Sequence, residues 1–143
     1  MAVAIANRVM TSRLAVLTSA QPGDVSGHLR DAAGTIVDRW TRTVRQHLTG
    51  NRFTDDELNS LSDRERRDLA DDPLHAYGST LLCLAVTPAG VYYLQLGDGD
   101  IVFVARDGTA WQPLGADTRM MGNETSSLCV PNARRDFRVG ADP

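Results

Sequence analysis

The first third of the chain places apolar residues with the period of an amphipathic helix. Over residues 2–17 they recur at roughly helical spacing, and the pattern stops before residues 21–23, a Gln-Pro-Gly sequence that terminates helices. Over residues 29–48 the apolar positions lie three and four apart, while Asp38 and several arginines fall elsewhere around the helix. This second segment closes at Gly50. The pattern predicts two long helices.

Two short helical turns are predicted after this pair. Thr54 and Glu57 have the spacing of a capping box, and so do Ser62 and Glu65; in this motif a hydroxyl and a carboxylate satisfy free backbone N–H groups. The many charges between residues 55 and 72 are typical of a solvated face. Pro73 is expected to end the helical part, so residues 1–72 should be mainly helical.

From residue 77 onward the pattern is that of β-strands. Residues 80–87 are continuously apolar, and Pro88 to Gly90 reverse the chain into the next strand. The strands expected after this reversal are 91–96, 101–105, 109–114, 127–130 and 136–139. Short turns between them predict an antiparallel sheet over residues 77–143. We therefore expect a single, partial α+β domain in which two long antiparallel helices pack on one sheet face.

The apolar strand at residues 80–87 is typical of a strand that is covered on both faces. The helix pair can cover only one face, and the chain has little left to cover the other. We expect the second sheet to come from a partner or from a larger domain. A homo-oligomer formed through the exposed sheet is one such arrangement.

Composition and charge exclude several classes of protein. A chain of 143 residues with 42% hydrophobic residues can bury a core as one domain. Its net charge of -3 gives no electrostatic argument for binding nucleic acid or an anionic membrane. No apolar run reaches the roughly 20 residues that cross a bilayer, and polar residues interrupt the N-terminal segment where a signal peptide must be apolar. Cys83 and Cys129 are expected to be reduced thiols in a cytoplasmic protein.

The turn between the second and third predicted strands reads GDGD and carries two carboxylates, Asp98 and Asp100. Carboxylates on a glycine-rich turn are well placed to hold a hard divalent cation. The alternative is an ordinary Asp-Gly turn without a ligand, which Asp and Gly favour by themselves. Two carboxylates are also too few for a tight magnesium site unless water or a substrate phosphate completes the shell.

Other candidate residues carry weaker signals. The three histidines, His28, His47 and His75, are scattered without the spacing of metal ligands. Ser79 and Thr80 lack the strand-turn-helix context of a nucleophile elbow, so we interpret them as small residues that open a strand.

Four more charged residues stand in the last part of the chain. Glu124 is either a carboxylate near the GDGD turn or an ordinary polar loop residue, and these two interpretations stay open. Arg134, Arg135 and Arg138 could contact a phosphate, but a solvated strand face is the favoured interpretation.

Several short motifs follow one another in the second half of the chain. YGSTLL opens a buried strand, and VYYLQLGDGDIVFVARDG contains a Gly-Asp turn followed by a strand and a DG hairpin. The loop at residues 123–125 reads NET. In this order the motifs resemble the metal-dependent protein serine/threonine phosphatases of type 2C, particularly their divergent bacterial branch. The resemblance covers residues 1 to about 139, and residues 77–128 are its specific part.

The resemblance implies a four-layer αββα sandwich with two manganese or magnesium ions in a central cleft. A metal-bound hydroxide would attack a phosphoserine or phosphothreonine, so no protein nucleophile is needed. Asp98 matches the Gly-Asp turn of the family, which implies the role of an accessory ligand for an additional, weaker metal. Asp100 stands where the family often has arginine, so the resemblance implies a metal-ligand role for Asp100 less strongly than for Asp98.

The resemblance also implies core metal ligands that we do not locate in this sequence. They are an aspartate in a DG motif before the first long helix and further aspartates near the C-terminus. The sequence thus resembles a truncated central segment, and we expect this chain alone to be inactive. The alternatives are a noncatalytic pseudophosphatase that binds a phosphoprotein or a protein kinase, and a small structural protein that dimerises.

Overall fold

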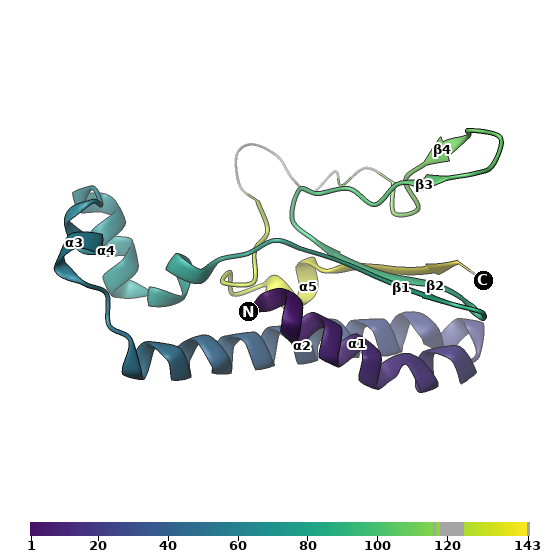
Figure 1. The fold of residues 1–143 in the computed structure, drawn as a ribbon, viewed down its shortest axis with the longest axis horizontal. Helices are drawn as coiled ribbons and strands as arrows, with labels where there is room; N and C mark the ends of the chain where they lie inside the picture. Colours follow the sequence, from purple (N-terminus) through teal and green to yellow (C-terminus); the bar gives the residue numbers. More distant parts are fainter. Residues whose placement is uncertain (116, 118–124, 143) are drawn as a thin grey trace.

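The computed structural model describes residues 1–115, 117 and 125–142. Two long helices form one layer of it: α1 (Ala2–Ser19) and α2 (Pro22–Gly50) lie side by side and run in opposite directions (Figure 1). α2 begins seven residues before the predicted segment, because Pro22 occupies the first turn, where a missing N–H costs no hydrogen bond. The predicted helix pair is confirmed.

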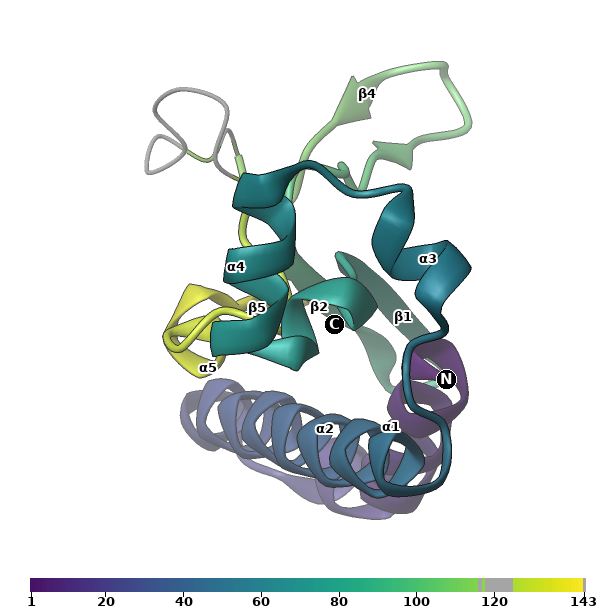
Figure 2. The ribbon, with the colours of Figure 1, turned by 90° about the vertical axis from the view of Figure 1, so that its left-hand side faces the viewer.

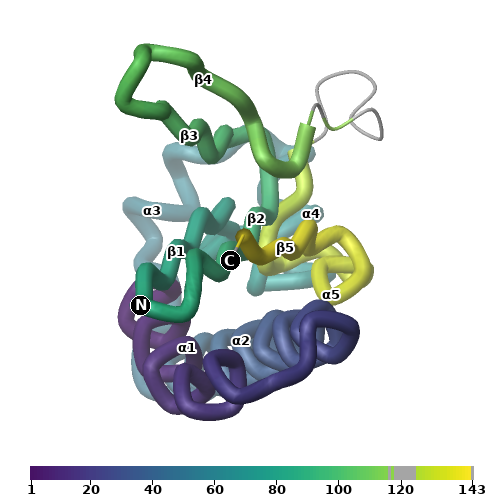
Figure 3. Tube along the Cα trace, turned by 90° about the vertical axis from the view of Figure 1, so that its right-hand side faces the viewer, coloured from purple at the N-terminus to yellow at the C-terminus, as the bar shows by residue number. Residues whose placement is uncertain are grey.

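A three-stranded antiparallel sheet lies on this helix pair. Its strands are β1 (Leu81–Thr87), β2 (Gly90–Leu96) and β5 (Arg138–Asp142), in the order β1-β2-β5. The register pairs Leu84 with Tyr93, and Tyr93 with Gly140. Both long helices lie on the same side of the sheet, and β1 forms its outer edge above α1 (Figure 3). The predicted α+β class, with long helices packed on an antiparallel sheet, is confirmed.

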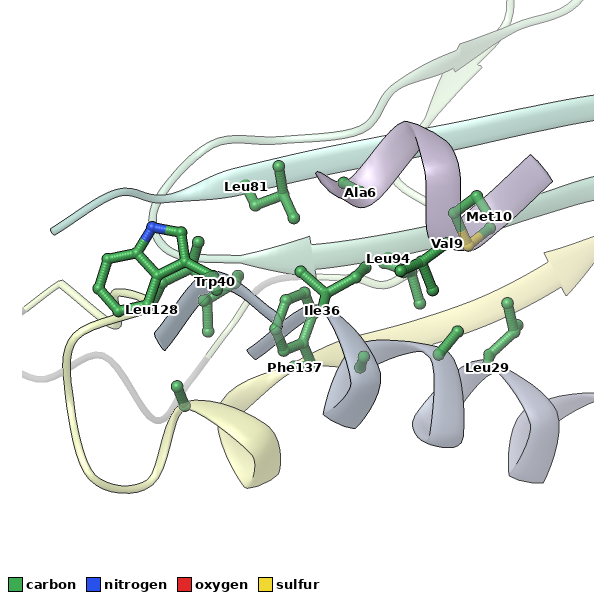
Figure 4. Packing of buried hydrophobic residues seen from close by; sticks show 14 of the residues in the cluster. Ala6, Val9, Met10, Leu29, Ile36, Trp40, Leu81, Leu94, Leu128 and Phe137 are labelled. Carbon is green, nitrogen blue, oxygen red and sulfur yellow. The ribbon is translucent and has the colours of Figure 1, made fainter. Parts of the chain in front are cut away.

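The core lies between the helices and the sheet. Figure 4 shows that its side chains come from both long helices, the sheet and the segment before β5. The members that are at most 2% exposed include Val9, Leu29, Ile36, Trp40, Leu94, Leu128 and Phe137. Tyr92 also faces the helices, and its hydroxyl donates a hydrogen bond to the carbonyl of Leu17 over 3.2 Å.

The opposite face of the sheet is covered only in part. At β2, Tyr93 is 4% exposed, and its ring contacts Phe103 edge-on at a centroid distance of 5.6 Å. At β1, Leu82, Leu84 and Val86 are 45%, 50% and 73% exposed. The predicted shortage of cover on this face therefore falls on β1.

Both predicted capping boxes are present, at the starts of two short helices that lie nearest the viewer in Figure 2. They open α3 (Asp55–Asn59) and α4 (Asp63–Asp71), and in each the hydroxyl accepts the N3 backbone N–H while the glutamate accepts the N-cap N–H. These hydrogen bonds lower the pKa of Glu57 and of Glu65. The expectation that Pro73 ends the helical part is wrong, because Pro73–Tyr77 forms a 3₁₀-helix, η1, whose first turn tolerates proline.

The predicted meander is wrong in its later strands. β3 (Phe103–Val104) and β4 (Ala110–Trp111) form a separate two-stranded sheet and do not extend β2. Residues 128–130 form a turn and a bend in place of the strand predicted at 127–130, and Ala133–Asp136 forms a short helix, α5. These short apolar runs do not specify strand pairing alone, because pairing also depends on which partner edge they reach.

Candidate functional site

The GDGD turn directly follows β2, at the end of the sheet where β1 begins. Gly97 has a φ of +98°, a left-handed conformation that favours glycine. A Cβ atom on Gly97 would lie 2.4 Å from Cγ2 of Thr80 and 3.1 Å from the carbonyl oxygen of Ser126. The turn is therefore built on close backbone packing against the two neighbouring segments.

Three of the motifs noted in the sequence meet at this end of the sheet. The backbone N–H of Leu128 donates to the carbonyl of Ser79 over 3.0 Å. A Cβ atom on Gly78 would lie 3.0 Å from both the Cys129 Sγ and the Ser127 Oγ. The GST segment, the GDGD turn and the segment that follows the NET loop thus contact one another. Glu124 lies outside the described residues, so its two interpretations stay open.

Gln95 positions the turn, and sequence reasoning missed it. This side chain is only 3% exposed, and its Nε2 donates a hydrogen bond to the carbonyl of Gly99. Gly99 in turn packs against Leu82, since a Cβ atom there would lie 2.9 Å from Leu82 Cδ1. A single amide inside the apolar run of β2 was the available signal, because a buried amide needs a hydrogen-bond partner.

Asp98 and Asp100 are both exposed at this turn. Over residues 1–115, 117 and 125–142, no group of three or more His, Cys, Asp or Glu side chains is placed to hold a metal ion. Magnesium favours octahedral oxygen coordination and takes only part of its shell from water. The described residues therefore do not fit a binuclear metal centre. The accessory-ligand role of Asp98 and the weaker claim of Asp100 stay predictions.

The histidines lie apart from the turn. His28 and His47 are on α2, and His75 is in η1. The ring of His47 contacts Tyr77 edge-on at 5.7 Å.

The hydroxyl of Ser79 donates to the carbonyl of Thr80 over 2.8 Å. This local hydrogen bond agrees with the interpretation of Ser79 as a residue that opens a strand.

The arginines do not form the predicted solvated strand face. Arg134 and Arg135 are exposed on the short helix α5, and Arg134 pairs with Asp38 on α2. The Arg138 side chain is 14% exposed and donates hydrogen bonds to the carbonyls of Leu114 and Gly115. Its Nε lies 3.9 Å from the Oδ2 of Asp117. Arg138 is therefore buried between the sheet and the segment after β4, where it makes internal contacts.

Two side chains of the sheet have a raised pKa. Burial, followed by the hydrogen bond to Asp142 and its negative charge, raises the pKa of Tyr93 to about 12. The hydroxyl of Tyr93 donates to the Asp142 Oδ2 over 2.9 Å. Burial also raises the pKa of the Cys83 thiol, so it is protonated at neutral pH and a poor nucleophile.

A comparison with known protein families matches residues 1–142 to protein phosphatase 2C. The chain belongs to the protein phosphatase 2C family. No curated protein and no solved structure matches the chain. The phosphatase 2C match includes the helix pair and all three strands of the main sheet, so the resemblance first noted at residues 77–128 is confirmed at the level of the family. The bacterial branch stays a prediction.

No helix in the described part of this phosphatase 2C chain combines the length and the apolar character needed to cross a membrane.

Proposed function

We propose that this chain has the scaffold of a metal-dependent serine/threonine phosphatase but does not hydrolyse phosphoesters by itself. The family assignment supports the scaffold. The observation that supports the predicted inactivity is that, among the described residues, Asp98 and Asp100 belong to no group of three or more His, Cys, Asp or Glu side chains that could hold a metal ion. A cytoplasmic location is part of this proposal.

The GDGD turn is proposed to bind manganese or magnesium weakly. Asp98 and Asp100 are both exposed and are separated by Gly99 alone, and water would supply the remaining ligands. Screening by solvent and salt weakens such a site. Asp98 would be the accessory ligand and Asp100 the lesser contributor.

The alternative proposal is a noncatalytic module that binds a phosphoprotein or a protein kinase. The exposed apolar side chains of β1 favour it over an isolated enzyme, because contiguous exposed apolar surface marks an interaction site. This alternative and the main proposal share the expectation that the chain has no turnover of its own.

Both halves of the main proposal can be tested on the purified 143-residue chain. Manganese binding is measured by calorimetric titration, and hydrolysis of p-nitrophenyl phosphate is followed over the same manganese series. We expect weak binding, which Asp98→Asn abolishes, and no manganese-dependent turnover. The matched control is Asp107→Asn, because Asp107 also precedes a glycine at a turn but lies in the β3-β4 hairpin.

Two outcomes would contradict the proposal. Robust manganese-dependent turnover that Asp98→Asn abolishes would overturn the predicted inactivity. Equal manganese affinity in Asp98→Asn and Asp107→Asn would overturn the role of Asp98 as a ligand.

A further inference from the structure

The second half of α2 carries a run of basic residues on its exposed side. Arg39, Arg42 and Arg45 are all exposed, and neither Asp nor Glu occurs between residues 39 and 54. At about 100° per residue, these three arginines lie within an arc of about 120° around the helix. Trp40 and Val44 are at most 1% exposed and face the core, so this arc is on the opposite side of the helix. We call the three arginines the α2 arginine stripe.

Contacts inside the chain do not account for the α2 arginine stripe. None of its three guanidinium groups forms an ion pair with a carboxylate among the described residues. Asp38 precedes the stripe on the same helix, and its carboxylate pairs with Arg134 of α5. Cations favour a helix C-terminus only within the last turn, whereas Arg39 and Arg42 lie more than one turn before Gly50. The stripe is therefore available to an anionic partner.

The charge of the rest of the chain limits the size of such a partner. The segment that follows, residues 55–72, contains eight acidic and three basic residues and forms α3 and α4 beyond the end of α2 (Figure 1). The net charge of the whole chain is -3. A long or flat polyanion, such as duplex DNA or an anionic membrane, would meet these carboxylates as it reached the stripe, and like charges repel. A short acidic segment would not extend that far.

From these observations we infer that the α2 arginine stripe binds an acidic segment of another protein, a short stretch with several Asp or Glu residues. A guanidinium group can donate two parallel hydrogen bonds to one carboxylate. The stripe spans about 9 Å along the helix axis, which an extended chain covers in about three residues. A few neighbouring carboxylates can therefore reach all three arginines at once. This surface is separate from the GDGD turn and goes beyond the proposed function.

The test measures the binding of fluorescein-labelled octaglutamate to the full chain by fluorescence anisotropy, with EDTA present to remove divalent metal ions. We expect binding at low salt that weakens as sodium chloride rises from about 20 mM to about 200 mM, because solvent screens exposed pairs. Arg42→Glu should weaken binding by about fivefold or more, since it replaces an attraction by a repulsion. The triple variant Arg39→Glu, Arg42→Glu, Arg45→Glu should abolish binding.

The matched control is Arg67→Glu. Arg67 is exposed on α4, so this variant changes the net charge by the same amount without altering the stripe. Its affinity for octaglutamate should stay within about twofold of that of the natural chain, because exposed charges at a distance are screened. Circular dichroism verifies that all variants are folded.

Two further probes test the class of the partner. Labelled duplex DNA and vesicles that contain phosphatidylglycerol should both bind more weakly than octaglutamate at the same salt concentration, because the carboxylates of residues 55–72 repel them.

Three results would overturn the inference: no binding of octaglutamate at low salt, equal weakening by Arg42→Glu and Arg67→Glu, or tighter binding of duplex DNA or vesicles than of octaglutamate. No probe in this test requires a metal ion, so this test and that of the proposed function fail independently.

Discussion

The two faces of the three-stranded sheet both carry apolar side chains, but they differ in how far these side chains are buried. On the helix side Leu94 is 0% exposed, whereas on the other side Leu84 is 50% exposed. The second face itself is divided, because Tyr93 lies over Gly140 of β5 and is buried, while β1 beside it stays open. Hydrophobic sequence alone therefore does not determine burial; the elements that reach each face do.

The largest expected effect is the difference in stability lost when one leucine is shortened on each face of the sheet. Leu94→Ala should lower the free energy of unfolding by about 3 to 5 kcal/mol, because it leaves a cavity in the packed core. Leu84→Ala should change it by no more than about 0.5 kcal/mol in dilute protein, because its side chain is half exposed. Urea unfolding of both variants measures the difference. Equal losses would mean that the second face is covered in solution.

The next effect concerns the turn at the end of the sheet. Gly97→Ala should cost about 2 to 4 kcal/mol, since it combines a positive φ with a clash against Thr80. The matched variant Gly99→Ala should cost less, because its Cβ atom would meet only the flexible end of the half-exposed Leu82. Urea unfolding again measures both. A reversed order would contradict the packing described for this turn.

The smallest expected effect is a loss of stability at alkaline pH. Tyr93 has an ordinary pKa of 10 that rises to about 12 in the folded chain, so the folded state favours the neutral phenol. Its contribution is complete below pH 10 and is lost as the pH rises from 10 to 12, by up to about 2 to 3 kcal/mol.

Denaturant unfolding on both sides of this pH window tests the effect. Tyr93→Phe should remove this part of the alkaline loss, whereas Tyr77→Phe should keep it. The same pH dependence in natural chain and Tyr93→Phe would show that Tyr93 is not buried as described.

Local sequence signals predicted a large part of this fold. The helix pair, both capping boxes and the β1-β2 hairpin each depend on residues close together in the chain, and their spacing was sufficient. β5 begins and ends closer to the C-terminus than the strand predicted at 136–139. Its pairing with β2 was not predicted, because this pairing depends on contacts distant in sequence.

The candidate site was predicted less completely. The order of GST, GDGD and the segment after the NET loop indicated the family, and the structure brings the described parts of these motifs together. Gln95 was missed because its partner, the carbonyl of Gly99, is defined only by the geometry of the turn. Arg138 was misread because its partners come from the segment after β4, which the strand pattern did not place.

The sheet order also bears on synthesis of the chain by the ribosome. β1 and β2 are joined by a tight turn and emerge together, whereas β5, the strand on the other side of β2, emerges much later. At about 5 to 20 residues per second, the nascent hairpin spends several seconds with both of its edges unpaired. During this interval the β2 edge that β5 later covers is open to incorrect strand pairing.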